Sequence, residues 1–321
     1  MTSNKDVLVV AETRQGAFRA VTWELVAAGR ALARETGGRL VLAVIDAAAE
    51  PLAREAEMCG AEEILSISTP GGFEANLWQF ATESVITNVD PLAVLTGYTV
   101  DAMGFAPAVA ARLGLGFASD VIALNASPGL TVRRGAYSDK LVAQLSFPGK
   151  EASVIMVRPG AFTAEPAGSS PASVRQLNID ATGRSEVEHL GFIEAPAGGV
   201  DITKADFLLS VGRGIQDEDN LPQFTALAEA LGATLSVSRP LVDAGWVEAA
   251  RQVGQSGKTV KPRVYLALGI SGAIQHLAGI REAEVVIAVN TDPEAPIFGV
   301  ADFGVVADLF DIADALESTL G

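Results

Sequence analysis

The sequence predicts an α/β protein of two domains, each built around a largely parallel sheet. With 321 residues the chain is too long for one small core and long enough to bury two. Both halves alternate short apolar runs with stretches of helical periodicity, which is the pattern of parallel strands joined by helices. A segment rich in Ala, Gly, Pro and Ser separates the halves, so we expect each half to fold around its own core.

Four buried parallel strands are expected in the first half, because short apolar runs are typical of strands that are covered on both faces. They are residues 7–11, 40–45, 64–67 and 92–96. In the helix expected after the first strand, Val21, Leu25, Ala28 and Leu32 recur at helical spacing. This spacing forms one apolar stripe, which should pack against the sheet with right-handed crossovers.

The rhythm changes after Asp120, where Gly, Pro and Ser rather than helices separate the apolar runs. Strands at 121–124, 130–133, 141–147 and 153–157 are therefore predicted to add to the sheet edge in antiparallel order. Residues 161–198 combine weak periodicity with many small side chains, which predicts a linker with room for one pairing strand. We place the boundary near Gly199, which gives domains 1–198 and 199–321.

The second half restarts the α/β alternation. Strands are expected at 207–211, 234–237, 264–268, 285–289 and 304–306. An amphipathic helix is expected around 221–231, and a terminal helix from Leu309. Strands that alternate with helical segments again predict a parallel sheet.

The charge balance excludes some classes of partner. The 23 basic and 39 acidic residues give a formal net charge of −16, which repels phosphate backbones and anionic lipid surfaces. Nucleic acid is therefore not expected as a partner, nor is membrane insertion, since the uncharged stretch 264–280 contains Gly, Ser, Gln and His. Cys59 is the single cysteine and no leader pattern precedes the first strand, so we expect a cytoplasmic protein.

A glycine turn follows the strand expected at 264–268. Gly269 and Gly272 open a turn that leads into a helix start at residues 273–276. Such glycines allow backbone N–H groups at a helix start to approach a phosphate. The spacing is G-x-x-G and lacks the full dinucleotide fingerprint, so a phosphate-binding turn and a plain packing turn both stay open.

A local excess of positive charge lies in the same half. From Asp201 onward there are 8 basic and 17 acidic residues, a net charge of −9. Between Arg239 and Arg263 the balance reverses, with five basic residues against Asp243 and Glu248. An anionic ligand would favour such an island, and a solvated basic face is the alternative.

Other polar residues suit a ligand cradle better than a hydrolytic centre. The loop 253–257 (VGQSG) offers backbone donors and two polar side chains. Asn290 and Asp308 stand at or just beyond strand ends, the edge at which parallel sheets bind ligands, although either could be a helix cap. With two histidines, His189 and His276, and one cysteine, neither a metal site nor a catalytic triad is expected.

Six stretches of the second half carry a family resemblance. They read SVGRG (210–214), SRPLVDAGW (238–246), QVGQSGK (252–258), YLALGISGAIQHLAG (265–279), VIAVNTDPEAPIF (286–298) and ADFGVVADLF (301–310). In these stretches the chain resembles the α subunits of electron-transfer flavoproteins, and the first half resembles them more loosely.

The resemblance implies an N-terminal nucleotide-alpha-hydrolase-like parallel sheet that packs on a β subunit, and a C-terminal Rossmann-like parallel sheet that binds FAD. One FAD per heterodimer is implied in this chain, with AMP in the β subunit. The implied FAD-binding residues are Arg213, Ser238, Arg239, Val253, Gly254, Gln255, Ser256, Ser271, Gly272, Ala273, Ile274, Gln275, His276, Asn290, Asp308 and Leu309.

The resemblance also implies a role for each group of residues. Arg213 and the turn 271–276 would serve the pyrophosphate and the flavin. Asn290, Asp308 and Leu309 would line the adenosine end.

The isoalloxazine would be surrounded by Ser238, Arg239 and the loop 253–256. Ser256 stands where many relatives have Thr, and both residues supply a hydroxyl donor. His276 and Arg239 would stabilise the negative charge that reduction places on the flavin.

The first half points to the electron donor. RRGAYSDKL (133–141) and SFPGKE (146–151) are similar to methylotroph flavoproteins that pair with trimethylamine dehydrogenase. Mitochondrial relatives usually have Gly two residues after the position of Tyr137, where this chain has Asp139. The resemblance therefore favours an amine or methylated-amine dehydrogenase as donor over an acyl-CoA dehydrogenase, with a membrane quinone oxidoreductase as an example of the acceptor.

We expect an electron carrier without substrate turnover of its own. A second hypothesis is a component of an electron-bifurcating flavoprotein, whose β subunit would bind a second FAD and oxidise NADH. A third is an NAD-dependent enzyme that is related by fold alone.

Overall fold

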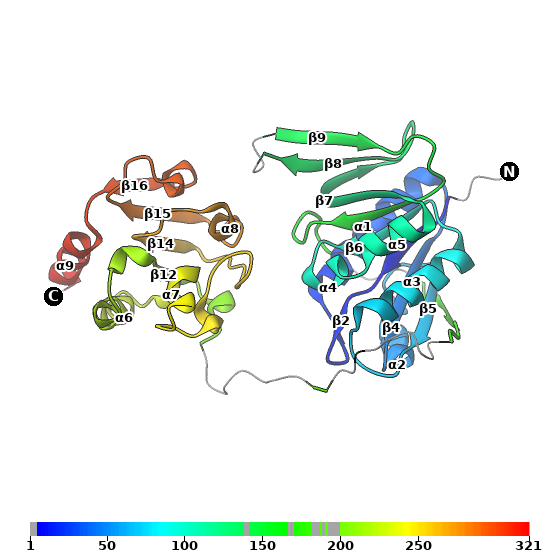
Figure 1. Cartoon of the computed structure of the whole chain (residues 1–321), viewed down its shortest axis with the longest axis horizontal. Helices are drawn as coiled ribbons and strands as arrows, with labels where there is room; N and C mark the ends of the chain where they lie inside the picture. The colour runs from blue at the N-terminus through cyan, green and yellow to red at the C-terminus, as the bar shows by residue number, and fades with distance from the viewer. Residues whose placement is uncertain are drawn as a thin grey trace. The chain divides into compact units, whose positions relative to one another are not determined.

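The computed structural model describes residues 5–137, 141–165, 168, 170–180, 187, 190, 191 and 200–320 (Figure 1). The chain divides into two compact units, residues 1–191 and 192–321. Asp139, His189 and Gly199 lie outside the described residues, as does much of the expected linker. The domain limits 1–198 and 199–321 therefore stay a prediction.

The first unit is an α/β structure around a nine-stranded sheet. Its strands are β1 (Val7–Val10), β4 (Leu40–Asp46), β5 (Glu63–Ser68), β6 (Ala93–Gly97), β7 (Gly116–Asn125), β8 (Thr131–Ala136), β9 (Leu141–Ser146), β10 (Ser153–Val157) and β11 (Ser173–Gln176). Its helices are α1 (Ala20–Thr36), α2 (Ala49–Glu55), α3 (Ala75–Val89), α4 (Val100–Met103) and α5 (Ala106–Leu113). The strand order is β11-β5-β4-β1-β6-β10-β7-β8-β9, and β2 (Thr13–Arg14) forms a separate hairpin with β3 (Ala17–Phe18).

The side chains of β1 show why this sheet needs helices on both faces. Val7 and Val9 belong to the core that the sheet forms with α1 and α2. Leu8 and Val10 point the other way, into the core with α3 and α5. Four consecutive buried residues therefore serve two cores, and the apolar stripe expected on α1 is buried as predicted.

One strand of the expected antiparallel edge is wrong. β7, β8 and β9 pair in antiparallel order as predicted, but β10 lies between β6 and β7 and is parallel to both. All five residues of β10 are buried, whereas most residues of β9 face solvent. A continuous apolar run without alternation is the pattern of a central parallel strand. The turn residues before β10 instead suggested another antiparallel hairpin.

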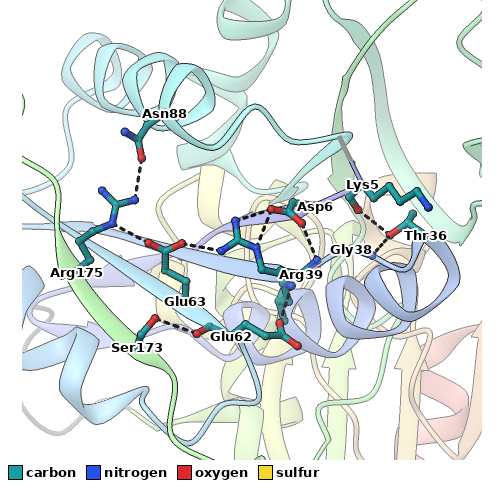
Figure 2. A network of polar contacts seen from close by, with 11 residues as sticks. Lys5, Asp6, Thr36, Gly38, Arg39, Glu62, Glu63, Asn88, Ser173 and Arg175 are labelled. Carbon is teal, nitrogen blue, oxygen red and sulfur yellow. Dashed lines mark hydrogen bonds and ion pairs between the residues drawn. The ribbon is translucent and has the colours of Figure 1, made fainter. Parts of the chain in front are cut away.

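The described part of the segment after β10 contains one strand, as predicted for residues 161–198. β11 adds in parallel to β5, at the edge of the sheet opposite β9. Figure 2 shows polar contacts at the start of these strands, where Arg175 donates to Glu63 (Nε to Oε1, 2.8 Å) and to Asn88 (2.8 Å). Arg39 pairs with Asp6 (2.7 Å) and with Glu63 (3.4 Å). The network therefore joins β11 to β5, β4 and the approach to β1.

Gly38 lies beside this network and has no room for a side chain (Figure 2). A Cβ at this position would collide with the backbone carbonyl of Lys5. We expect Gly38→Ala to lower the free energy of unfolding by about 1–3 kcal/mol, as overpacking does, in urea denaturation. Gly71→Ala is the matched control, since nothing lies within 4 Å of a Cβ there, and should change stability by less than about 0.5 kcal/mol. Equal effects of the two variants would contradict this account.

The second unit is built on a five-stranded parallel sheet of order β13-β12-β14-β15-β16. Its strands are β12 (Phe207–Val211), β13 (Thr234–Val237), β14 (Val264–Leu268), β15 (Val285–Asn290) and β16 (Phe303–Val306), each within one residue of its predicted bounds. Its α-helices are α6 (Leu221–Ala230), α7 (Arg239–Asp243), α8 (Ile274–Leu277) and α9 (Leu309–Leu320). Short 3-10 helices are η1 (Ile202–Lys204), η2 (Arg213–Ile215), η3 (Glu218–Asn220), η4 (Ala249–Arg251) and η5 (Pro296–Gly299).

The two faces of this sheet are covered differently. Leu209 and Val211 pack with α6 and α9 on one face. Leu208 and Tyr265 lie on the other face, whose cover comes from irregular segments such as the loop around Val253 and the single turn of α8. The chain passes from β12 to β13 on one side and then to β14 on the other, so the strand order reverses at β12 and β14. Open parallel sheets bind ligands outside the carboxyl ends of the strands at such a reversal.

The predicted α/β class, with a largely parallel sheet in each half, is confirmed. Among the described residues, no helix has both the length and the apolar character needed to cross a membrane.

Candidate functional site

A cavity of about 520 Å³ opens at the carboxyl end of the second sheet. This volume lies within the range of small-molecule sites, roughly 300–1,000 Å³. The cavity lies where the strand order reverses, because segments that follow β12, β13 and β14 meet the end of β15 there. The fold therefore places its ligand-sized space at the position that the topology predicts.

Most residues that the resemblance implies are gathered around this cavity. Twelve of the sixteen line it, namely Arg213, Ser238, Arg239, Val253, Gly254, Gln255, Ser256, Ser271, Ala273, Gln275, His276 and Asn290. Gly272 packs against Ile297 instead, and the Ile274 side chain is half exposed. Asp308 caps α9 by accepting from the N–H of Phe310 (2.9 Å), and Leu309 is buried in the core.

Six further residues line the cavity and are absent from the implied set. They are Gly214, Pro240, Asp243, Gln252, Gly269 and Ile270. All six lie in the stretches that carry the resemblance, which is the signal that could have found them. Asp243 follows Arg239 by four residues, the spacing at which opposite charges pair on a helix.

The turns after β12 and β14 touch through their main chains. The N–H of Gly214 donates to the carbonyl of Gly269 (3.2 Å). Gly269 has a φ of 63°, and a Cβ on it would lie 2.8 Å from the Cα of Gly214. Glycine is therefore required on both sides, for the left-handed backbone and for the close approach.

Unused backbone donors follow this contact. Among the residues that the structure describes, the N–H groups of residues 271–275 donate no hydrogen bond. The turn is held from outside by Asn290, whose Nδ2 donates to the carbonyl of Ile270 (2.9 Å). α8 is a single turn (Ile274–Leu277), at the place where a helix start was predicted. Ser271, Ala273 and Gln275 of this row line the cavity, so their free N–H groups are available to an electron-rich ligand group.

The loop around Ser256 forms the opposite wall. Gln252 donates from Nε2 to the Ser256 hydroxyl oxygen (2.9 Å), which leaves the hydroxyl proton available to a ligand. The N–H of Gln255 donates to the carbonyl of Gln275 (2.7 Å). Gly254 and Gly279 are in backbone contact, since a Cβ on Gly279 would lie 2.6 Å from the Cα of Gly254. The loop is thus fixed to the segment that carries the free donors.

His276 lines the cavity and is only 7% exposed. Its Nε2 lies 2.9 Å from the Tyr265 hydroxyl, and its Nδ1 is buried without a hydrogen-bond partner. Burial lowers the pKa of this imidazole to about 4. The Val253 carbonyl lies close enough to oppose the shift in part, without the geometry of a hydrogen bond to Nδ1. His276 is therefore neutral near pH 7, when one ring nitrogen donates and the other accepts.

Arg239 is the first residue of α7, with Pro240 as the second. Its Nε pairs with Asp243 (3.2 Å), and its side chain is 65% exposed. The positive charge at this wall is therefore partly offset and well solvated. Of the five basic residues between Arg239 and Arg263, Arg239 alone lines the cavity, and Arg251 instead donates to the carbonyl of Leu235 (2.9 Å). The structure thus brings one of the five basic residues of the island, Arg239, to the cavity wall.

The matching end of the first sheet is filled by a side chain. Glu12, just after β1, is 8% exposed and accepts a hydrogen bond from the Thr99 hydroxyl (2.7 Å). A Cβ on Gly97 would collide with its carboxylate, and the space beside it is about 10 Å³. Burial raises the pKa of the Glu12 carboxyl. Among the described residues, no group of His, Cys, Asp and Glu could hold a metal ion.

The fold and the cavity place the chain in the class of α/β proteins that bind a ligand where a parallel sheet reverses its strand order. Residues 7–190 match the family described as electron transfer flavoprotein domain, and residues 201–281 match the electron transfer flavoprotein FAD-binding domain. The electron transfer flavoprotein subunit alpha of Methylophilus methylotrophus is 39% identical over 98% of both chains. The subunit alpha of Bacillus subtilis is 34% identical over 97% of this chain and 96% of its own. The chain belongs to the electron-transfer flavoprotein α-subunit family.

A more distant relative has a different name. The lactate dehydrogenase (NAD(+),ferredoxin) subunit LctC of Acetobacterium woodii is 32% identical over 97% of this chain and 76% of its own. The relatives of this chain therefore carry the names of more than one kind of redox protein.

The contact between Gly254 and Gly279 should control the loop that carries Ser256. We expect Gly279→Ala to force this loop away from α8 and to speed tryptic cleavage after Lys258 about 5- to 30-fold, as local opening becomes easier by 1–2 kcal/mol. Gly299→Ala is the matched control, because nothing lies within 4 Å of a Cβ there. An unchanged cleavage rate in Gly279→Ala would show that the loop does not depend on this contact.

The neutral His276 predicts a dependence of stability on pH. Below pH 6.5 the unfolded imidazole binds a proton that the folded one, with a pKa of about 4, does not bind. The native state should therefore lose about 2 kcal/mol between pH 7.5 and pH 5 through this residue. His276→Gln should lack this contribution, so the difference between wild type and variant in urea unfolding should shift by that amount in favour of the variant. A constant difference across this pH range would show that the imidazole is not desolvated.

Proposed function

We propose that this chain binds FAD in the cavity of its second unit and passes single electrons as the α subunit of a heterodimer. The observation that carries the proposal is the row of free N–H groups at residues 271–275, of which Ser271, Ala273 and Gln275 line the cavity. The first N–H groups of a helix have no partner inside the helix, so a ligand at this wall can accept from them. Donors left unused at a cavity wall are what a ligand rich in acceptor oxygens would satisfy.

The donors suit the two kinds of acceptor that FAD presents. The pyrophosphate needs positive charge and N–H groups, and the exposed Arg213 and the turn 271–275 supply both. The flavin edge needs neutral donors at its carbonyl oxygens and ring nitrogens, and Ser256 and His276 supply them. Asn290 lines the cavity, whereas Asp308 and Leu309 would support the adenosine end from behind it.

The protein residues would hold the cofactor and bias its charge. FAD supplies the acceptance and release of single electrons when it is bound. His276 would contribute as a neutral donor, since its imidazole stays uncharged near pH 7. Arg239 would add positive charge that Asp243 partly offsets, so its electrostatic effect should be smaller than that of an unpaired guanidinium.

The assembly follows from the family. The names of the relatives describe a subunit alpha, and we propose a β subunit with AMP as the partner of this chain. We propose an amine or methylated-amine dehydrogenase as donor, on the resemblance of residues 133–141 and 146–151 to methylotroph flavoproteins. We further propose a downstream quinone oxidoreductase as acceptor, a cytoplasmic location and no substrate turnover by this chain.

A second function is favoured by one relative. LctC of Acetobacterium woodii is named as a subunit of an NAD(+)- and ferredoxin-dependent lactate dehydrogenase. A bifurcating complex would need a second FAD in the β subunit. Two flavins per heterodimer and reduction by NADH would favour this function over the simple carrier.

We expect the heterodimer, co-expressed with its β subunit, to yield one FAD per α chain on extraction. Arg213→Ala should weaken FAD binding about tenfold or more, because a charge-assisted hydrogen bond contributes about 1.5–3 kcal/mol. Arg263→Ala is the matched control, since this residue does not line the cavity. Extraction of FMN, or no flavin in the gently purified wild type, would overturn the proposed function. Equal losses in both variants would show that overall charge, and not the cavity, governs binding.

A further inference from the structure

Asn290 contacts the turn after β14 from the end of the neighbouring strand β15. Its Nδ2 donates to the carbonyl of Ile270 (2.9 Å), and its Oδ1 accepts from the N–H of Asp292 (2.9 Å). A carbonyl can only accept and a backbone N–H can only donate, so these two partners fix which end of the amide is which. The direction of the hydrogen bond to Ile270 is therefore determined.

This hydrogen bond orients the peptide between Ile270 and Ser271. In a trans peptide such as this one, the C=O and the following N–H lie in one plane and point in opposite directions. The Ile270 carbonyl points to Asn290 at the end of β15, so the N–H of Ser271 points away from β15. The neighbour of β14 on that other side is β12, which Arg213 follows. Ser271 and Arg213 both line the cavity, so the N–H is directed to the side from which a positive charge comes.

A second hydrogen bond holds the next peptide from the same segment. The carbonyl of Ser271 accepts from the N–H of Ile297 (3.1 Å), in η5 after β15. A Cβ on Gly272 would lie 2.3 Å from that nitrogen, so the turn packs directly on η5. Within the described part of the chain, the N–H of Ser271 itself donates no hydrogen bond. This donor is not an end effect of α8, since Ser271 precedes the N-cap residue Ala273.

The orientation of this peptide decides the sign of the charge that the turn presents. A peptide turned the other way round would present the Ile270 carbonyl oxygen to the cavity in place of the Ser271 N–H. A carbonyl oxygen repels an anionic ligand, whereas an N–H attracts it. The amide of Asn290 favours the second orientation, because it holds the carbonyl on the β15 side.

We propose that Asn290 is a positioning residue that holds the N–H of Ser271 toward the pyrophosphate of the bound FAD. The proposal rests on the proposed function, because the pyrophosphate belongs to the ligand proposed there. The resemblance implies that Asn290 lines the adenosine end, whereas this geometry assigns it to the support of a main-chain donor. A hydrogen bond to a charged acceptor is stronger than one between neutral groups, so the held peptide contributes to the affinity for a phosphate.

The test measures FAD affinity and the amide signal of Ser271 in a heterodimer labelled with ¹⁵N-serine. In the wild type, loading with FAD should move this amide proton downfield, because the N–H then donates to a charged acceptor. Asn290→Leu should lose most of this shift and weaken FAD binding about fivefold to twentyfold, since the peptide is no longer held. The signal is assigned by its absence in Ser271→Ala.

Asn220→Leu is the matched control. Nδ2 of Asn220 donates to the carbonyl of Ile215 (2.8 Å) in the same unit, and neither residue lines the cavity. The control therefore removes the same kind of hydrogen bond at a place that the ligand does not reach. It should leave both the FAD affinity and the Ser271 signal as they are in the wild type.

Each outcome decides the proposal. An unshifted Ser271 signal in the FAD-loaded wild type overturns it, as does a full shift or an unchanged FAD affinity in Asn290→Leu, while the proposed function stands. Equal losses of affinity in Asn290→Leu and Asn220→Leu would reveal a merely structural role and overturn it too. A wild-type heterodimer without FAD overturns both the proposal and the proposed function. If Asn290→Leu does not fold, Asn290→Asp takes its place, because aspartate can still accept from the N–H of Asp292 but cannot donate to Ile270.

Discussion

The second unit depends on two main-chain turns that touch with no side chain between them. Gly214 after β12 and Gly269 after β14 approach closely enough that a Cβ on either would collide with the other. The contact keeps the ends of neighbouring strands together where the strand order reverses. Arg213 lies next to Gly214 in sequence, and the free N–H groups of residues 271–275 follow Gly269. Both segments therefore reach the same cavity.

The chemistry of the cavity is mostly that of neutral dipoles. The chain carries a formal charge of −16, and the positive charge of Arg239 at the wall is partly offset by Asp243. His276 is uncharged, and backbone N–H groups form the longest row of donors. Fixed dipoles in a partly dry cavity act on a ligand without the desolvation penalty of a buried charge.

Much of the fold could be predicted because hydrophobic periodicity is local. The five strands of the second sheet lie within one residue of their expected bounds, since each is a short apolar run that ends in a polar or glycine turn. β10 was missed as a central strand because pairing is a long-range property, and the turn residues before it suggested a continued meander. The helix start expected at residues 273–276 is present as α8, a single turn from Ile274 to Leu277.

The candidate site could be predicted in composition better than in contacts. All eighteen residues that line the cavity lie in the motif stretches and twelve of them belong to the implied FAD-binding set, but sequence spacing could not show that Asp243 partly offsets Arg239. Nor could it separate Arg251, which ties η4 to β13, from the basic residues that face a ligand. Tyr265 reads as an ordinary strand residue, and its contact with His276 appears only when β14 and α8 are folded together.

The donors of residues 271–275 have a consequence for how such a site evolves. A hydrogen bond from a backbone N–H survives replacement of the side chain. Single substitutions at Ala273 or Gln275 therefore change the shape of the cavity wall but leave the N–H donor in place. Proline is the exception, because it alone lacks the N–H group. A mutational scan that averages over all substitutions would therefore rate this turn as tolerant, although its main chain would supply the hydrogen bonds of the proposed site. Selection at such a turn preserves the backbone conformation and not the side chains. Sequence variability at these positions is therefore a poor measure of their importance for ligand binding.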